Sequence, residues 1–188
     1  YGIQLRSASS NLIEGNRIVR NLGTGIYLRY DPNGAPPAGS TANTIQNNWI
    51  YYNGDATTGT YDDCGISFFD DAVGLECIDN VVIKIVIVCS YDSGLEFRTA
   101  SRQNTVMWNT IFNNATGAAA GDGIELFDDN TTIEGLITDR NGGDARGWDA
   151  SAGATTPINY CIAGDTVDAD TDIGTDFATA TDPRFVAT

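Results

Sequence analysis

The chain contains no histidine among its 188 residues, and its four cysteines, at 64, 77, 89 and 161, form no Cys-x-x-Cys pair. A structural zinc site is therefore not expected, because such sites are built from closely spaced cysteines and histidines. Basic residues are also scarce: ten lysines and arginines stand against 25 aspartates and glutamates, so the formal net charge is −15. A surface this acidic repels a phosphate backbone, and we expect no nucleic-acid partner.

Long apolar runs are missing as well. The longest run, Val81 to Cys89, is interrupted by Lys84 and has the length of a strand, so no membrane span is expected. A hydrophobic content of 41% still suffices for the core of one domain. Low lysine, abundant Asn, Thr, Gly and Asp, and strong acidity are typical of secreted β-proteins. We therefore predict an extracellular or cell-surface location.

The sequence does contain a short phrase that is repeated five times. Each copy reads glycine, apolar, variable, apolar, and the copies are 2–5, 25–28, 65–68, 94–97 and 123–126. Such alternation predicts a β-strand with its apolar side chains on one face and its variable side chains on the other. The copies are unequally spaced, which indicates a solenoid with one turn per copy and insertions confined to loops.

A second phrase, built on asparagine and isoleucine, follows the first. It covers 11–21, 43–53 and 104–114, and it recurs at 130–141 with Gly135 in place of the middle asparagine. Asparagine suits a tight corner because it tolerates the left-handed backbone region and bonds its own main chain. Stacked asparagines can also form a hydrogen-bonded ladder. Short strands with asparagine corners and no helical periodicity predict an all-β parallel β-helix.

The paired phrases resemble the repeats of right-handed parallel β-helix proteins, a group that includes pectate-lyase-like enzymes, phage tailspikes and surface proteins. The resemblance is clearest over residues 1–141 and implies a right-handed parallel β-helix, or β-solenoid, of about six to seven turns over residues 1–164. An acidic segment, 165–188, would follow as a last irregular turn or a tail that joins subunits. The fold does not select a function, because it carries lyases, hydrolases, epimerases, adhesins and inert spacers.

Stacking the strand phrases in register creates two outward rows on one sheet. The first row is predicted to contain Gln4, Tyr27, Ser67, Glu96 and Glu125, and the second Arg6, Arg29, Phe69, Arg98 and Phe127. Strands ~4.8 Å apart bring Glu96 close to Glu125, with Arg98 beside both. Paired carboxyls can raise a pKa for general acid catalysis, and an arginine can bind a uronate or abstract a proton. If the chain is an enzyme, Glu96, Arg98 and Glu125 are its candidate catalytic residues; the alternative is an ordinary surface ladder.

Aromatic and basic side chains of the same rows are the candidate carbohydrate-binding residues, namely Tyr27, Arg29, Phe69 and Phe127. Aromatic residues in the second phrase, among them Trp49, Tyr51 and Tyr52, could stack on sugar rings or on another protein chain. The resemblance also limits the chemistry. Hydrolases of the polygalacturonase type combine paired aspartates with a histidine, which this chain lacks, whereas a lyase mechanism with calcium and an arginine base stays open.

Alternate aspartates in the acidic segment are candidate ligands of structural calcium, because calcium prefers oxygen ligands. They are Asp168, Asp170, Asp172 and Asp176. The spacing does not match an EF-hand loop, and a solvated acidic tail is the alternative.

Covalent features are also predicted. A disulfide between Cys64 and Cys89 would clamp the long third turn, while small buried thiols are the alternative. Asn114 and Asn130 each begin a glycosylation sequon.

The ends of a β-helix expose unpaired backbone groups, which another copy could cover in a head-to-tail association that does not close. We therefore predict from the sequence a non-catalytic extracellular structural or adhesive β-solenoid that self-assembles end to end into a surface filament. The alternative is a polysaccharide-binding or lyase-like carbohydrate-active domain with an acidic or neutral polysaccharide as its partner. A passive spacer in a surface protein is the third interpretation.

Overall fold

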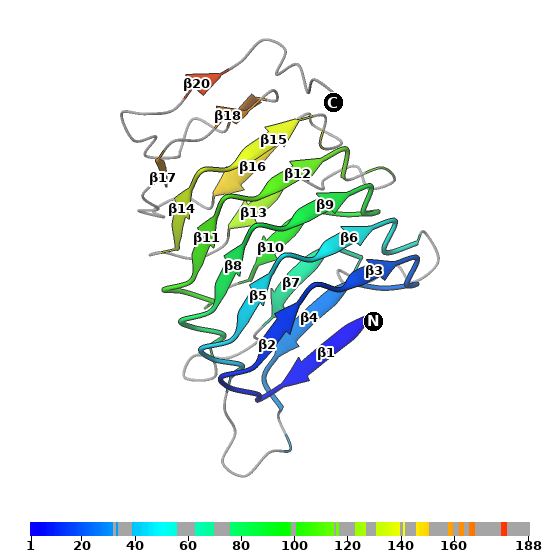
Figure 1. Ribbon diagram of the computed structural model, residues 1–188, viewed down its shortest axis with the longest axis vertical. Helices are drawn as coiled ribbons and strands as arrows, with labels where there is room; N and C mark the ends of the chain where they lie inside the picture. Colours follow the sequence, from blue (N-terminus) through cyan, green and yellow to red (C-terminus); the bar gives the residue numbers. More distant parts are fainter. Residues whose placement is uncertain are drawn as a thin grey trace.

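The computed structural model describes residues 1–31, 33, 39–55, 63–69, 76–98, 101–114, 116, 123–126, 131–139 and 141, together with strands at 146–150, 158–159, 162–163, 166–167 and 178–179. The chain forms a coil whose turns are stacked on one another, and equivalent strands of successive turns pair in parallel to form three β-sheets (Figure 1). The predicted all-β parallel β-helix is thereby confirmed. No helix in the described part of the chain is long and apolar enough to cross a membrane.

Each of the first six turns contributes one strand to each sheet, and two further strands extend sheets 1 and 3. Sheet 1 contains, in spatial order, β1 (Ile3–Arg6), β4 (Ile26–Arg29), β7 (Ile66–Phe69), β10 (Leu95–Phe97), β13 (Ile124–Leu126), β16 (Arg146–Ala150) and β19 (Thr166–Val167). Sheet 2 contains β2 (Leu12–Glu14), β5 (Thr44–Gln46), β8 (Val81–Ile83), β11 (Thr105–Met107), β14 (Thr132–Glu134) and β17 (Ile158–Asn159). Sheet 3 contains β3 (Arg17–Val19), β6 (Trp49–Tyr51), β9 (Val86–Val88), β12 (Thr110–Phe112), β15 (Ile137–Asp139), β18 (Ile162–Ala163) and β20 (Ala178–Thr179). Two strands of the acidic segment, β19 and β20, therefore continue the sheets by pairing with β16 and β18.

The corner between sheets 2 and 3 is two residues long after each of the strands β2, β5, β8, β11 and β14. The first of the two residues has a φ between 53° and 68°, the left-handed region, and these residues are Gly15, Asn47, Lys84, Trp108 and Gly135. The prediction that asparagine itself occupies the left-handed corner position is thus wrong at most corners. The asparagine usually follows it, because its side chain is needed for bonding between turns.

Asparagine side chains connect neighbouring turns, as predicted. At the corner between sheets 1 and 2, Oδ1 of Asn43 accepts hydrogen bonds from the backbone N–H and the Nδ2 of Asn11, both at 3.0 Å. Nδ2 of Asn43 in turn donates to Oδ1 of Asn80 at 3.0 Å, and Nδ2 of Asn80 donates to Oδ1 of Asn104 at 3.1 Å. The ladder satisfies buried corner groups that would otherwise destabilise the fold.

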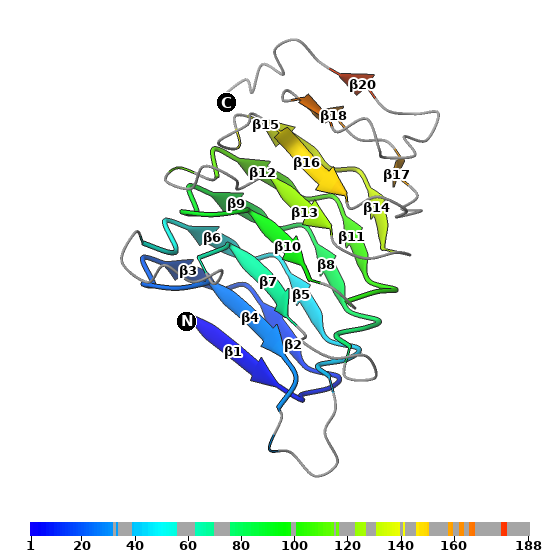
Figure 2. The same cartoon turned by 180° about the vertical axis from the view of Figure 1, so that it is seen from behind.

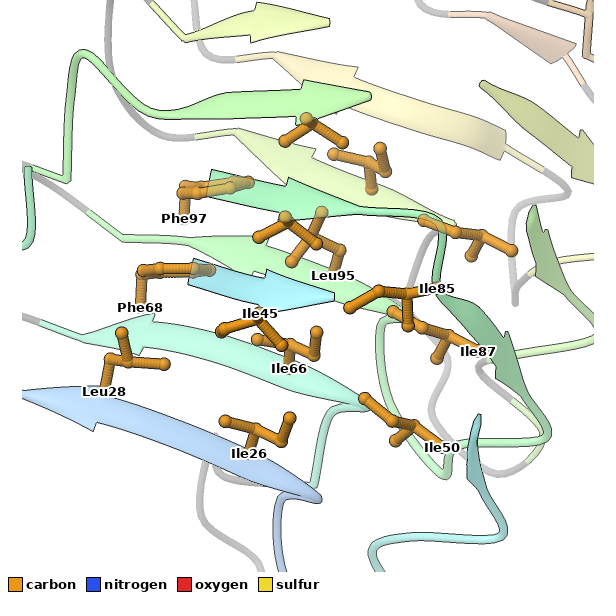
Figure 3. Close-up of a cluster of buried hydrophobic side chains, with 14 of the residues drawn as sticks. Ile26, Leu28, Ile45, Ile50, Ile66, Phe68, Ile85, Ile87, Leu95 and Phe97 are labelled. Carbon is orange, nitrogen blue, oxygen red and sulfur yellow. The ribbon is translucent and has the colours of Figure 1, made fainter. Parts of the chain in front are cut away.

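Apolar side chains of like register stack along the axis of the helix and form its core (Figure 3). Ile26, Ile66 and Leu95 occupy equivalent positions on successive strands and are fully buried. Phe68 and Phe97 are stacked in the same way, with ring centroids 4.5 Å apart and planes 13° from parallel. Stacking of like residues makes the core continuous from one described turn to the next.

The glycine that leads each strand phrase lies where the chain passes from sheet 3 into sheet 1. A Cβ atom on Gly65 would lie 2.3 Å from Cγ2 of Ile87 and 2.5 Å from the carbonyl oxygen of Gly94. No side chain fits at these distances. The glycine is required by the close approach of the next turn and of the core, and this accounts for its repetition in the sequence.

Candidate functional site

Figure 2 shows the strands of sheet 1 from outside the coil. The first predicted row has the predicted register, and so have Arg6, Arg29 and Phe69 of the second row. Gln4, Tyr27, Ser67, Glu96 and Glu125 pair in turn along the sheet. However, only Gln4 is exposed; Glu125 is half-buried, and Tyr27, Ser67 and Glu96 are buried. Tyr27, Ser67 and Glu96 are therefore not surface positions, whereas Gln4 and Glu125 keep contact with water.

Glu96 lies at the centre of a hydrogen-bonded cluster. Its Oε1 accepts from Nε of Arg98 at 2.8 Å and forms an ion pair with Nη2 of Arg98 at 2.7 Å. Its Oε2 accepts from Oγ of Ser67 at 2.7 Å and lies 3.6 Å from Sγ of Cys64. The side chain of Arg98 is 18% exposed and that of Glu96 only 1%. Glu96 therefore lies beneath the surface and fixes the position of the partly exposed guanidinium through its ion pair.

Burial shapes the protonation of this cluster. It raises the pKa of Glu96, although the bonds from Arg98 and Ser67 oppose the rise. Burial also raises the pKa of Asp92 from its ordinary value, against the hydrogen bond from the backbone of Ser93 and the charge of Arg98. The pKa of the Cys64 thiol is raised well above its usual range by burial and by the neighbouring carboxyls. The thiol is therefore held protonated, and the carboxyls keep their protons to a higher pH than exposed ones.

Residues that precede the leading glycines complete the cluster, and the sequence-based prediction missed them. Cys64 lies beside Glu96, and Oγ of Ser93 donates to Oε2 of Glu125 at 3.0 Å. A signal was present, because Thr24, Cys64 and Ser93 all stand directly before a leading glycine and all are fully buried. A small polar residue at this place in the repeat indicates a position beside the outward row.

Tyr27 is not available as a carbohydrate platform, contrary to the prediction. It is 1% exposed, its ring is stacked on Tyr1 with centroids 4.5 Å apart, and Phe69 approaches it at 5.9 Å. Arg29 and Phe69 are half-buried and face outward beside it. The guanidinium of Arg98 lies 5.7 Å from the centre of the Phe69 ring, so Phe69 borders the cluster. Phe127 lies outside the described residues.

Two further predictions are wrong in the structure. Cys64 and Cys89 are free thiols, and Sγ of Cys89 instead accepts a hydrogen bond from Nδ2 of Asn113 at 3.0 Å. Asn114 is 2% exposed, and its Nδ2 donates to Oδ1 of Asn141 at 2.9 Å. Its amide is therefore part of a corner ladder and not a glycosylation acceptor in the folded chain.

The remaining predicted sites lie outside the described residues. They are the second sequon at Asn130 and the calcium ligands Asp168, Asp170, Asp172 and Asp176. Within the described part of the chain, no three Cys, Asp or Glu side chains are grouped closely enough to hold a metal ion.

Comparison with known proteins identifies the architecture. The family model described as "Right handed beta helix region" matches residues 1–98. Among solved structures, the crystal structure of an alginate lyase from Paenibacillus sp. str. FPU-7 superposes with a TM-score of 0.72 at 18% sequence identity, over 86% of this chain. The chain spans 56% of the length of that lyase. No curated protein matches the chain.

Proposed function

This chain belongs to the right-handed β-helix family, and from that premise we propose that it binds an acidic polysaccharide on the outer face of sheet 1 and cleaves it by a lyase-type elimination. This is the alternative interpretation of the sequence, and the cluster of buried Glu96 with partly buried Arg98 and Glu125 favours it over a non-catalytic filament. A purely structural sheet gains little from a buried ion pair, because removing two charges from water costs about as much as their attraction returns. Perturbed carboxyls around an arginine are typical of functional sites. The similarity to an alginate lyase agrees in substrate class.

Arg98 is the proposed binding residue for a uronate carboxylate. An arginine fork has five N–H donors, more than the single carboxylate of Glu96 uses, and it matches carboxylate geometry. Glu96 is a positioning residue: it fixes the guanidinium through Oε1 and is itself too deeply buried to reach a sugar. Pairing of the uronate with Arg98 also stabilises the charge that develops on the carboxylate when the adjacent proton leaves.

Glu125 is the proposed proton-transfer residue. It lies one strand from Glu96 in register and is less buried, and Ser93 orients its Oε2. In the proposed elimination its carboxylate takes the proton from C5 of the uronate. The electron pair of that C–H bond forms the C4–C5 double bond as the bond from C4 to the glycosidic oxygen breaks. The protonated Glu125 then returns the proton to the leaving oxygen.

The test is to incubate the chain with alginate and with polygalacturonate and to follow the ultraviolet absorbance of the unsaturated product. Arg98→Ala and Glu125→Gln should each lower the rate at least ~100-fold, the size of an ordinary general-base or charge-stabilising contribution. Arg102→Ala is the matched control, because Arg102 forms its ion pair with Glu76, whereas Arg98 forms its own with Glu96. Absence of unsaturated product from both polysaccharides would refute cleavage, and an unchanged rate of product formation by Arg98→Ala would refute the site.

End-to-end self-association, structural calcium and an extracellular location stay predictions from the sequence. Filaments visible by electron microscopy of the purified chain, and their loss on calcium chelation, would support the first two. Neither is required by the proposed reaction.

A further inference from the structure

A second candidate site lies on sheet 3, on another face of the coil from the Glu96 cluster. In Figure 1 strand β6 runs between β3 and β9. A groove of about 570 Å³ crosses these three strands and is lined by the outward side chains Arg17, Trp49, Tyr51, Tyr52, Val86 and Val88. The groove is not part of the site proposed above, and neither the family match nor the similar structure accounts for it.

The aromatic rings of the groove are exposed to an extent unusual for their type. Trp49 is 62% exposed and Tyr52 is 55% exposed, while Tyr51 is half-buried between them in sequence. Large apolar surfaces usually leave water on folding, so an exposed row of rings on a rigid sheet indicates a binding surface. Rings that combine an apolar face with a polar edge suit ligands that carry both C–H and O–H groups.

A cation stands directly beside these rings. Arg17 is the register partner of Trp49, its guanidinium carbon lies 5.1 Å above the centre of the Tyr51 ring, and its Nε donates to Oη of Tyr51. Within the described ranges no carboxylate lies within ion-pair distance of Arg17, since the ion pairs found there are those of Arg98 and Arg102. An arginine fixed on an aromatic ring can bind a carboxylate of a ligand in two-pronged geometry.

The charge at the β3 edge of the groove favours an anionic ligand. Arg17 lies in β3 and Arg20 directly follows that strand, whereas Arg6 and Arg29 lie on sheet 1 and Glu14 lies on sheet 2. This edge of the groove is therefore basic, although the whole chain has a net charge of −15.

The geometry points to a docking groove for a uronate-containing polysaccharide, in which Trp49 stacks on a sugar ring, Arg17 binds the carboxylate of a neighbouring uronate, and Tyr52 borders the groove. Successive strands of the sheet are ~4.8 Å apart, a spacing close to the length of one sugar unit in an extended chain. Arg17 on β3, Trp49 on β6 and Val86 on β9 are paired in register and can thus meet successive sugars. The groove is proposed to bind the polysaccharide and to perform no chemistry. This inference is therefore independent of whether the site on sheet 1 cleaves the polysaccharide.

The test measures the binding of a mannuronate hexasaccharide by calorimetry in the full chain carrying Glu125→Gln, which prevents turnover under the proposed mechanism. Adding Trp49→Ala or Arg17→Gln should weaken binding roughly tenfold, as expected for a central aromatic or arginine contact. Trp108→Ala is the matched control: Trp108 is 53% exposed but lies at a corner outside the groove, and its loss should change affinity less than twofold. Arg17→Gln keeps the aromatic surface, so it also covers the case in which the tryptophan variant folds poorly.

Three results would overturn the inference. Unchanged affinity in both groove variants would show that sheet 1 alone holds the ligand. Equal binding of cellohexaose, with no effect of Arg17→Gln, would exclude a preference for uronate. A concentration-dependent dimer in analytical ultracentrifugation that Trp49→Ala abolishes would show that the groove accepts a second copy of the chain instead.

Discussion

The corner between sheets 2 and 3 repeats the same conformation from turn to turn, whereas the outer face of sheet 1 changes its residue type from turn to turn. Each of these corners has two residues, and the first of them has the same left-handed conformation from Gly15 to Gly135. On sheet 1 the equivalent positions Tyr27, Ser67 and Glu96 share a register and little else. The regular corner sets the height of each turn, and the variable face carries charged groups that the scaffold does not need. Repetition in such a chain indicates structure, and departure from the repeat within a buried row indicates function.

The largest expected effect comes from breaking the passage into sheet 1. Gly65→Ala places a Cβ atom in contact with Ile87 and with the backbone of the next turn, and we expect a loss of about 3 kcal/mol in the free energy of unfolding. Gly15→Ala tests the corner: φ is 68° but no atom lies within 4 Å of the new Cβ, so backbone strain of about 1 kcal/mol is expected. Urea denaturation measures both. Equal losses would contradict the assignment of the leading glycine to close packing.

A smaller effect is expected within the corner ladder. Oδ1 of Asn109 accepts from the backbone N–H of Ile85 at 2.9 Å, and its Nδ2 donates to the carbonyl of Val82 at 2.9 Å, all in the interior. Asn109→Ala leaves both groups unsatisfied and should cost about 2 kcal/mol. The equivalent Asn16 is exposed, so water replaces its bonds and Asn16→Ala should cost less than about 1 kcal/mol. A comparable loss of unfolding free energy in both variants would show that burial does not determine how much an asparagine of the ladder stabilises the fold.

The smallest effect is a change in the pH dependence of stability caused by Glu96. Its pKa is raised in the folded chain, so folding is favoured most while Glu96 is protonated, below its ordinary value of 4.5, and that contribution is lost as pH rises through the folded value. Glu96→Gln removes this titration and keeps a hydrogen-bonding side chain. The stability of the variant relative to the natural chain should therefore increase from acid to neutral pH in urea denaturation series. A constant difference would mean that Glu96 is not perturbed.

The scaffold could be predicted from the sequence because its determinants are local and repeated. The alternation of apolar and variable residues in a phrase such as 25–28 determines which side chains point inward. The repetition of the phrase determines the register, and the predicted pairing of Glu96 with Glu125 is therefore confirmed. Burial of the outward row depends instead on contacts from outside the strand, such as Tyr1 on Tyr27, which alternation does not encode. For the same reason the role of Asn114 was predicted wrongly: a sequon describes three residues, whereas the ladder involves the next turn.

The left-handed corners were misassigned for a related physical reason. Propensity places asparagine in that conformation, yet Trp108 and Lys84 occupy it here. At Trp108 the cost of about 1–2 kcal/mol is offset because the neighbouring Asn109 then bonds to the preceding turn, whereas Lys84 is followed by Ile85, whose backbone N–H donates to Asn109. Bonding between turns outweighs local preference, and only a structure reveals which of two adjacent residues takes the strained position.

The ladder also dictates how the molecule acquires its structure. Its Asn–Asn bonds join residues only 24 to 37 positions apart, so ordering one turn against its neighbour closes a loop of moderate length and needs no contact from distant turns. A pair of turns formed anywhere can then serve as the template on which the next is laid, as in a zipper. Such a chain is a series of weakly dependent units, and turns can be lengthened, exchanged or duplicated during evolution while the chemistry on a neighbouring turn is left in place.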